Sequence, residues 1–255
     1  MTISLPAIYL CFLILCRGSA LLYNFPFGSS NNVPNTVKIG LSVGLSYTLF
    51  LTLSPTTTLP LPSGYLPFLL HIGKEIMIGW AMGITLRISF AIFETAGYCI
   101  ANEMGLNNSE IFNPSSEQSN NFISLMFSQL AIAIFFINGV YLDLLQCFVD
   151  SYRWSPIQEL SLSSSQFLLL IPLTQNIFTV AFKMAVPLIA LNLLITFAFS
   201  ILGKTSPKIN VFFLSFPLRI LLGLSLLSFI LYLCYSYITN EFARIPPTMN
   251  QITHG

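Results

Sequence analysis

Long apolar runs that are nearly free of charge dominate this chain and restrict the surroundings in which it can fold. Phe122 to Leu142 contains no charged residue, and a helix of about 20 residues spans a hydrocarbon core of about 30 Å. Only 7% of the 255 residues are charged, whereas a soluble domain has about 25%. The sequence therefore predicts an all-α integral membrane protein.

Charge and motif content exclude several functions. The net charge is +1 and no cluster of Lys or Arg is present, so nucleic acid is not expected as a partner. The five cysteines lie in or beside apolar runs without a CxxC pattern, and they are predicted to be small buried residues rather than metal ligands. No phosphate-binding glycine loop or nucleophile motif occurs. We therefore predict no enzyme, no catalytic residue, no cofactor and no metal site.

The first apolar segment, Ile3 to Cys16, ends at Arg17. It lacks a positive charge at its start, and Arg17 stands where a signal-peptide cleavage region should be small and neutral. We interpret the segment as a retained helix. For the arginine, snorkelling of the guanidinium to the membrane interface is favoured over a buried partner.

Two pairs of glycines at GxxxG spacing mark helices that can approach another backbone closely. The first pair, Gly40 and Gly44, lies in an apolar helix predicted from Val37 to Leu53. The second, Gly79 and Gly83, lies in the next helix. Four prolines in the stretch from Leu53 to Pro67, the last of them Pro67 itself, separate the two helices and exclude a regular span there.

The third helix, predicted from His71 to Ala101, carries Arg87 and Glu94 within an apolar run. Charges at membrane depth usually face a bundle interior or a cavity. Seven residues of helix separate the two by about 10.5 Å, so they share a face but cannot pair directly. An ion pair with another subunit is favoured for each over a transport or proton-relay role.

The C-terminal half is predicted to contain interrupted helices. Phe122 to Leu142 is expected to be one uninterrupted helix. Because prolines and a lysine interrupt the apolar runs that follow, we expect broken or kinked helices there, over Ser163–Phe182 and Met184–Leu202. The last apolar stretch, Ile209 to Tyr237, is expected to form a hairpin with the helix before it. The polar tail from Asn240 to Gly255 is expected to be poorly ordered.

A polar island, Asn102 to Asn121, interrupts the apolar sequence. It contains six Asn, four Ser and three Glu and no basic residue. At membrane depth, a non-helical polar segment persists only where protein buries it or where it lines a water-filled cavity. The distribution of Lys and Arg places the island outside and the turn around Lys204 and Lys208 in the cytoplasm.

The run from Pro187 to Leu224 closely resembles the signature of the FliR/SpaR/SctT family of type III export machines, which serve flagella or virulence. Its most specific part is Pro207-x-x-Asn210-Val-Phe followed by Ser-Phe-Pro217-Leu-Arg219. The resemblance extends over nearly the whole chain. This sequence has Asn113-Pro114 where many relatives have Asp-Pro, and Glu103 near a position where Gln is common.

The resemblance implies an export-gate subunit of the bacterial inner membrane, in an assembly raised partly toward the periplasm. Residues 1–180 are similar to a SctR-like part, 181–239 to a SctS-like hairpin, and 240–255 form a tail. The implied partners are SctR/FliP-like, SctS/FliQ-like and SctU/FlhB-like membrane proteins, unfolded exported proteins and membrane lipid. Flagellar and virulence use are not distinguished.

The resemblance also implies roles for individual residues. The segment 105–121 corresponds to a plug loop that helps to close the central pore. Its assigned residues are Gly105, Asn107, Asn108, Glu110, Ile111, Phe112, Asn113 and Pro114. Subunit contacts are assigned to Arg17, Arg87, Glu94, Pro207, Asn210, Pro217 and Arg219.

Two alternative functions stay open. A secondary transporter would use Arg87 and Glu94 at a midplane site, although the two comparable halves typical of such proteins are not found in the sequence. A purely structural scaffold would carry the island as an exposed loop.

Overall fold

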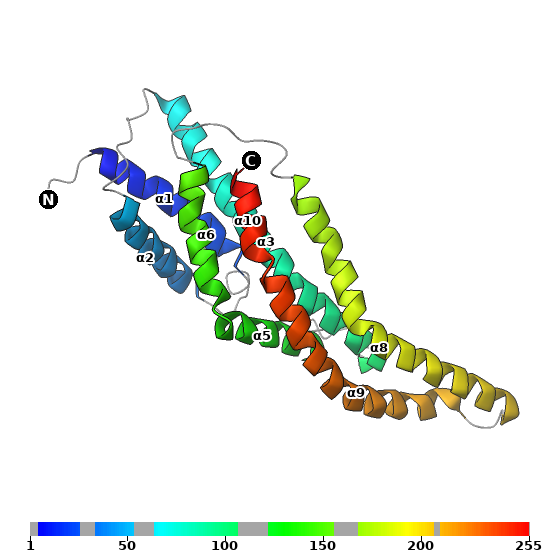
Figure 1. Ribbon diagram of the computed structural model, residues 1–255. Helices are drawn as coiled ribbons and strands as arrows, with labels where there is room; N and C mark the ends of the chain where they lie inside the picture. The colour runs from blue at the N-terminus through cyan, green and yellow to red at the C-terminus, as the bar shows by residue number, and fades with distance from the viewer. Residues whose placement is uncertain are drawn as a thin grey trace. The chain divides into compact units, whose positions relative to one another are not determined.

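The computed structural model describes residues 5–25, 34–53, 64–106, 122–155, 168–206 and 210–254. All regular secondary structure in these ranges is helical (Figure 1). The helices are α1 (Leu5–Tyr23), α2 (Asn35–Leu53), α3 (Tyr65–Met104), α5 (Phe122–Ile137), α6 (Val140–Trp154), α8 (Leu170–Thr205), α9 (Val211–Phe242) and α10 (Ile245–His254). The predicted all-α class is confirmed.

Four helical stretches are long and apolar enough to cross a membrane. They are Leu5–Tyr23, Tyr65–Met104, Leu170–Thr205 and Phe213–Thr253, and the bent pair α5 and α6 could form a fifth span. α3 has 40 residues, which gives it a length of about 60 Å. This is about twice the thickness of a hydrocarbon core. The chain is therefore a multi-pass membrane protein in which some helices exceed the length of a simple span.

The chain divides into two compact units, each assembled from separate stretches of sequence. Unit 1 contains residues 1–88, 141–173 and 244–255, and unit 2 contains residues 89–140 and 174–243. α1, α2, α6, α10 and the first part of α3 therefore belong to unit 1. α5, α9, most of α8 and the last part of α3 belong to unit 2.

Close packing of α1 against α3 organises unit 1. A Cβ atom added at Gly79 would overlap the backbone oxygen of Arg17, and one at Gly83 would lie 2.8 Å from the backbone oxygen of Leu21. The pair therefore permits the close backbone approach that its spacing predicts. Gly40 and Gly44 on α2 differ, because a Cβ atom at either would meet nothing within 4 Å.

Four phenylalanines form the centre of unit 2. The Phe242 ring of α9 lies 5.1 Å from Phe90, 5.5 Å from Phe93 and 5.6 Å from Phe135, measured between ring centroids. These tilted and edge-to-face contacts join α3, α5 and α9. A close crossing supports them, since a Cβ atom at Gly97 would lie 2.6 Å from Cα of Ser124 on α5.

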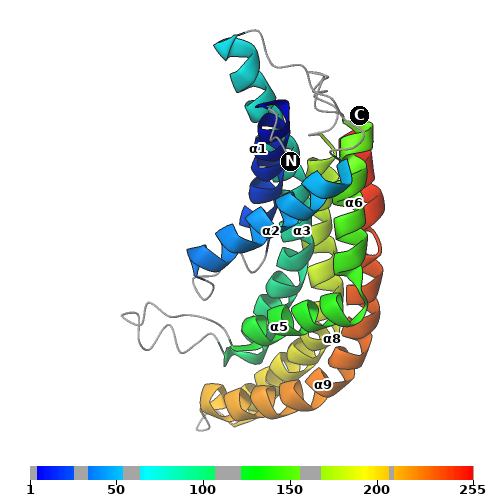
Figure 2. The same cartoon turned by 90° about the vertical axis from the view of Figure 1, so that its left-hand side faces the viewer.

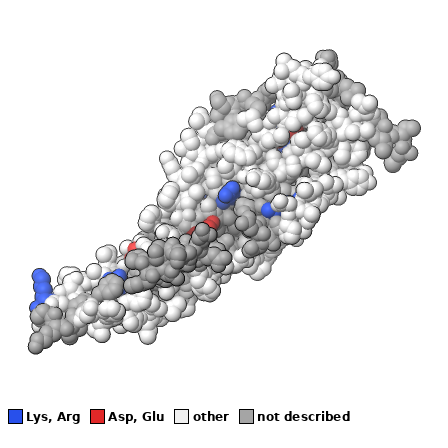
Figure 3. Space-filling model, turned by 180° about the vertical axis from the view of Figure 1, so that it is seen from behind, with Lys and Arg blue, Asp and Glu red and all other residues white. Residues whose placement is uncertain are grey.

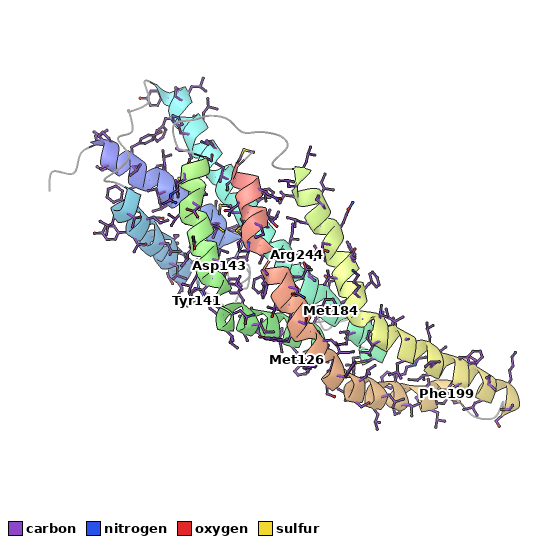
Figure 4. All side chains as sticks on the ribbon, viewed as in Figure 1. Met126, Tyr141, Asp143, Met184, Phe199 and Arg244 are labelled. Carbon is purple, nitrogen blue, oxygen red and sulfur yellow. The ribbon has the colours of Figure 1, made fainter. Side chains whose placement is uncertain are left out.

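α8 and α9 run side by side as an antiparallel hairpin in unit 2, as Figures 1 and 2 show. Asn176 near the start of α8 donates a hydrogen bond to Glu241 near the end of α9, at 2.7 Å. Arg219 donates to Thr196 at 3.1 Å, so residue numbers rise along one helix and fall along the other. The expected hairpin is present, and Figure 4 labels two buried residues of its first arm, Met184 and Phe199.

The prediction of one uninterrupted helix over 122–142 is wrong. α5 ends at Ile137 and α6 begins at Val140. Gly139 has a φ of 70° and its N–H bonds to the carbonyl of Phe136, an arrangement with which many helices end at glycine. The pair Asn138-Gly139 is therefore a helix stop that the uncharged composition concealed.

The region predicted to contain broken or kinked helices is one helix where it is described. α8 runs from Leu170 to Thr205 through Lys183 and Pro187. A proline inside a helix removes one hydrogen bond and bends the helix without necessarily ending it. Figure 1 shows that α8 changes direction along its course. Residues 163–167 of the predicted segments lie outside the described residues.

The prediction of a poorly ordered tail is also wrong. The tail is not poorly ordered, because α9 continues to Phe242 and α10 buries Ile245, Met249 and Ile252. Its two prolines follow Ile245 directly, in the first turn, where their missing N–H groups are not needed. α3 begins at Tyr65, earlier than predicted, and includes Pro67 in its first turn. Residues 54–63 of the proline-rich stretch lie outside the described residues.

Candidate functional site

A buried ion pair joins two helices in unit 1. Nε of Arg17 on α1 donates to Oε2 of Glu75 on α3 at 2.6 Å, and Nη2 donates to Oε1 at 2.9 Å. Both side chains are completely buried. This bidentate arrangement is the strongest geometry for a guanidinium and a carboxylate. The prediction that Arg17 snorkels to an interface is therefore wrong.

The same guanidinium also holds the C-terminal turn of α6. Nη1 donates to Oγ of Ser151 at 2.9 Å, and Nη2 donates to the carbonyl oxygen of Ser155 at 3.2 Å. The Tyr152 ring centroid lies 4.0 Å from the guanidinium carbon, within cation–π range. Arginine near the end of a helix is favourable because the last carbonyls are otherwise unsatisfied. Arg17 therefore contacts residues of its own chain and does not reach an outer surface.

A second polar cluster lies in unit 2. Nδ2 of Asn192 on α8 donates to Oε2 of Glu103 on α3 at 2.6 Å. One turn further along α8, Oγ1 of Thr196 accepts from Nη2 of Arg219 on α9 at 3.1 Å. Asn192 Oδ1 and Arg219 Nε are buried without hydrogen-bond partners in the part of the chain that the structure describes.

Arg87 and Glu94 on α3 are both exposed, and neither takes part in an ion pair with another described residue. Charged side chains are few on the face of the molecule in Figure 3, so isolated charges on an apolar helix are conspicuous. Within the described residues, neither side chain forms an ion pair or hydrogen bond with the predicted hairpin residues. Their assignment to contacts with another subunit stays a prediction.

The remaining predicted site residues fall into three groups. Asn210 is the N-cap of α9 and its side chain accepts a bond from the N–H of Phe213 at 3.5 Å, which is a local structural role. Pro217 is exposed inside α9, and Gly105 is buried at the end of α3 with a φ of 76°. The other predicted residues, Pro207 and the plug-loop residues from Asn107 to Pro114, lie outside the described residues.

Comparison with known proteins assigns the chain to a family. Residues 8–245 match the family of bacterial export proteins, family 1. The chain belongs to this family. It is 30% identical over 231 residues to the flagellar biosynthetic protein FliR of Escherichia coli K12, covering 91% of this chain and 87% of FliR. The expected FliR/SpaR/SctT family of type III export proteins is therefore confirmed.

Relatives from secretion systems match this export protein as well. It is 29% identical to the secretion system apparatus protein SsaT of Salmonella typhimurium, over 68% of this chain and 71% of SsaT. It is also 29% identical to the Yop proteins translocation protein T of Yersinia pestis, over 59% of each chain. Flagellar and secretion-system relatives thus have nearly equal identity to this export protein.

The export protein also carries a shallow apolar groove of about 650 Å³ on the C-terminal half of α8. The lining residues are Ala190, Leu193, Leu194, Thr196, Phe197 and Ser200. Most of them point outward, and sequence periodicity alone could not separate them from the buried face. The groove is open and apolar, which suits contact with lipid or with another apolar helix.

The chemistry of the two polar clusters is that of helix contacts. Each cluster links a carboxylate to an arginine or an amide on a different helix, and such bonds fix helix positions in apolar surroundings. Within the described ranges, no group of three or more His, Cys, Asp and Glu side chains is placed to hold a metal ion. Glu75, Glu103 and Asn192 were not predicted to make these contacts. Glu75 and Asn192 stand out only as polar residues inside apolar runs, and Glu103 lies near the start of the polar island.

Proposed function

We propose that this chain is a core subunit of the export gate of a type III secretion system. With partner subunits it forms the gated channel through which unfolded proteins cross the bacterial inner membrane. It acts by conducting and sealing rather than by catalysis. The observation that carries the proposal is the family match over residues 8–245, which covers nearly every described helix.

The proposed partners are SctR/FliP-like, SctS/FliQ-like and SctU/FlhB-like membrane proteins. Exposed Arg87 and Glu94 on α3 form no ion pair with another described residue, and they support such contacts because isolated charges are unfavourable against lipid. The apolar groove on α8 offers a further surface for an apolar helix. In this proposal residues 1–180 correspond to a SctR-like part and 181–239 to a SctS-like hairpin, and Pro207, Asn210, Pro217 and Arg219 lie near the subunit contacts.

We assign the plug of the channel to the segment 105–121. Its short polar side chains suit a seal that yields to an unfolded substrate without binding it strongly. The segment begins where α3 ends, at Gly105. The assembly is proposed to rise partly toward the periplasm, which the length of α3 supports, and the turn around Lys204 and Lys208 is placed in the cytoplasm.

Shortening the proposed plug tests this function. Deleting six residues within 108–119 should make cells that contain the assembled complex permeable to ions and to a small polar dye. A matched deletion of six residues within 157–166, between α6 and α8, is the control and should not raise dye uptake. If the plug deletion assembles with its partners and the membrane stays tight, the proposed plug is wrong.

Purification tests the proposed assembly. The tagged protein, extracted from its native membrane in mild detergent, should bring small hydrophobic SctR-like and SctS-like proteins at a fixed ratio. The charge reversals Arg87→Glu and Glu94→Lys should reduce this recovery, whereas Arg153→Glu, at an exposed position, should not. Recovery as a lone monomer, with the candidate partners present in the same membrane, would contradict the export-gate proposal.

A further inference from the structure

The hairpin of α8 and α9 holds the C-terminal turn of α3 at two neighbouring points in unit 2. Glu103 accepts the 2.6 Å hydrogen bond from Asn192 on α8. The next residue, Met104, is completely buried and lies against Gly223 on α9. Both arms of the hairpin therefore contact the last turn of α3.

The contact with α9 depends on the missing side chain of Gly223. A Cβ atom at this position would lie 2.7 Å from Cγ and 3.1 Å from Cε of Met104. Real side chains do not pack at such distances, so only glycine lets α9 approach the methionine this closely. This gives Gly223 a role within the chain, at the end of α3.

A line of polar groups continues the contact from α8 to α9. Oγ1 of Thr196 donates to the carbonyl oxygen of Asn192 at 2.7 Å and accepts from Nη2 of Arg219 at 3.1 Å. Asn192 and Thr196 are four residues apart, as are Arg219 and Gly223, so each pair occupies one face of its helix. Two successive turns of each arm thus face the same region.

We propose that Glu103, Asn192, Thr196 and Arg219 are positioning residues that, with Gly223, fix the end of α3 to the hairpin. Between apolar helices, packing alone permits sliding, whereas a hydrogen bond between polar side chains selects one register. Gly105, with its φ of 76°, ends the helix two residues after Glu103. The cluster therefore sets the place and direction in which the chain leaves α3.

This role requires Glu103 to accept a hydrogen bond and does not require its negative charge. The partner of Glu103 is the neutral amide of Asn192, and the Arg219 guanidinium bonds to Thr196 instead. Glutamine retains an acceptor oxygen at nearly the same place, whereas leucine has none. Glu103→Gln should therefore retain the positioning and Glu103→Leu should lose it.

A disulfide between positions 104 and 223 would report directly whether the end of α3 lies against α9. In the full chain, the double variant Met104→Cys with Gly223→Cys replaces the crowded methionine by a shorter side chain. Its two thiols can form a disulfide only if the Cβ atoms at positions 104 and 223 lie about 3.5–4.5 Å apart. We expect this double variant to cross-link rapidly in native membranes under mild oxidant. The two single-cysteine variants control for the five native cysteines and should give no intramolecular cross-link.

Substitutions in the cluster should slow this cross-linking. Because each variant removes the bond and leaves the other polar group of the pair without its partner, Asn192→Leu and Glu103→Leu should each reduce the rate about tenfold. Asn176→Leu is the matched control, since it removes another amide–carboxylate bond of the same hairpin, the one to Glu241. Glu103→Gln and Asn176→Leu should cross-link within about twofold of the parent.

Equal cross-linking rates in Asn192→Leu and the parent would overturn the proposal, as would a loss in Glu103→Gln as large as in Glu103→Leu. A consequence for sealing rests on the proposed function: Asn192→Leu should raise dye uptake. If cross-linking falls but neither this variant nor the plug deletion leaks, the proposed gate fails while the positioning role stands. If the plug deletion leaks but cross-linking does not change, the positioning role fails alone.

Discussion

Glu75→Ala should leave Arg17 as a buried cation without its counter-ion, which makes it the most informative single change in unit 1. The substitution removes two hydrogen bonds, of 2.6 and 2.9 Å, at a position with no exposure to solvent. Breaking one side of a buried ion pair lowers the free energy of unfolding by about 3–5 kcal/mol. The remaining bonds from Arg17 to α6 cannot neutralise its charge, so we expect the upper half of this range.

Thermal unfolding of the purified protein in detergent measures the effect. For a chain of this size about 1 kcal/mol corresponds to a shift in Tm of about 2–4 °C, so the variant should melt at least about 8 °C below the parent. Arg153→Ala is the matched control. It breaks a 3.2 Å pair with Asp150 whose arginine side chain is 76% exposed, and such surface pairs contribute at most about 1 kcal/mol.

The double variant Arg17→Met with Glu75→Leu separates the charge from the packing. Replacing both partners by apolar residues of similar volume is often neutral, so the double variant should recover most of the lost Tm. It should still loosen the end of α6, because Ser151 and the carbonyl of Ser155 lose their donor. A Tm for Glu75→Ala within about 2 °C of the parent would refute this account of the pair.

Three further predictions use the same melting assay. Gly79→Ala places a Cβ atom onto the backbone of α1 and should destabilise by at least about 2 kcal/mol, whereas Gly40→Ala meets nothing within 4 Å and should stabilise α2 by about 0.5–1 kcal/mol. Phe242→Ala removes the ring at the centre of four phenylalanines and should lose about 3–5 kcal/mol; Phe229→Ala, 58% exposed, should lose less than about 1 kcal/mol. Gly139→Ala forces a φ of 70° on an L-residue and should lose about 1 kcal/mol.

The sequence predicted the helical class and the number of apolar segments better than their boundaries. Apolar runs identify helices because backbone groups must be satisfied within the segment in an apolar medium. Boundaries depend on local chemistry that composition does not report. The stop at Asn138-Gly139 was not predicted, and the sequence left open whether Pro187 would break α8 or only bend it. A glycine or a proline is visible in the sequence, but its effect on a helix depends on its position within that helix.

The partners of charged residues could not be predicted from the sequence. Arg17 and Glu75 are 58 positions apart, and Glu103 and Asn192 are 89 apart. Which residues meet depends on the distance and rotation between two helices, and hydrophobic periodicity fixes neither. The glycine pair at 79 and 83 predicted a close approach, but not that α1 would be the approaching helix.

Two of the charged residues that bond within the chain lie four residues before a glycine at a close helix contact. Glu75 precedes Gly79 by one turn and Arg219 precedes Gly223 by one turn, and each of these glycines permits a close helix contact. The backbone of α1 approaches at Gly79 and the side chain of Met104 approaches at Gly223, and in both cases the charged side chain one turn earlier bonds within its own chain. Arg87 and Glu94 are followed at the same spacing by alanine and tyrosine, and both are exposed. α5 does approach α3 beside Glu94, where Oγ of Ser124 donates to the Glu94 carbonyl oxygen at 2.8 Å. Neither the Arg87 nor the Glu94 side chain forms an ion pair with another described residue, however, and we therefore expect both to contact a second protein.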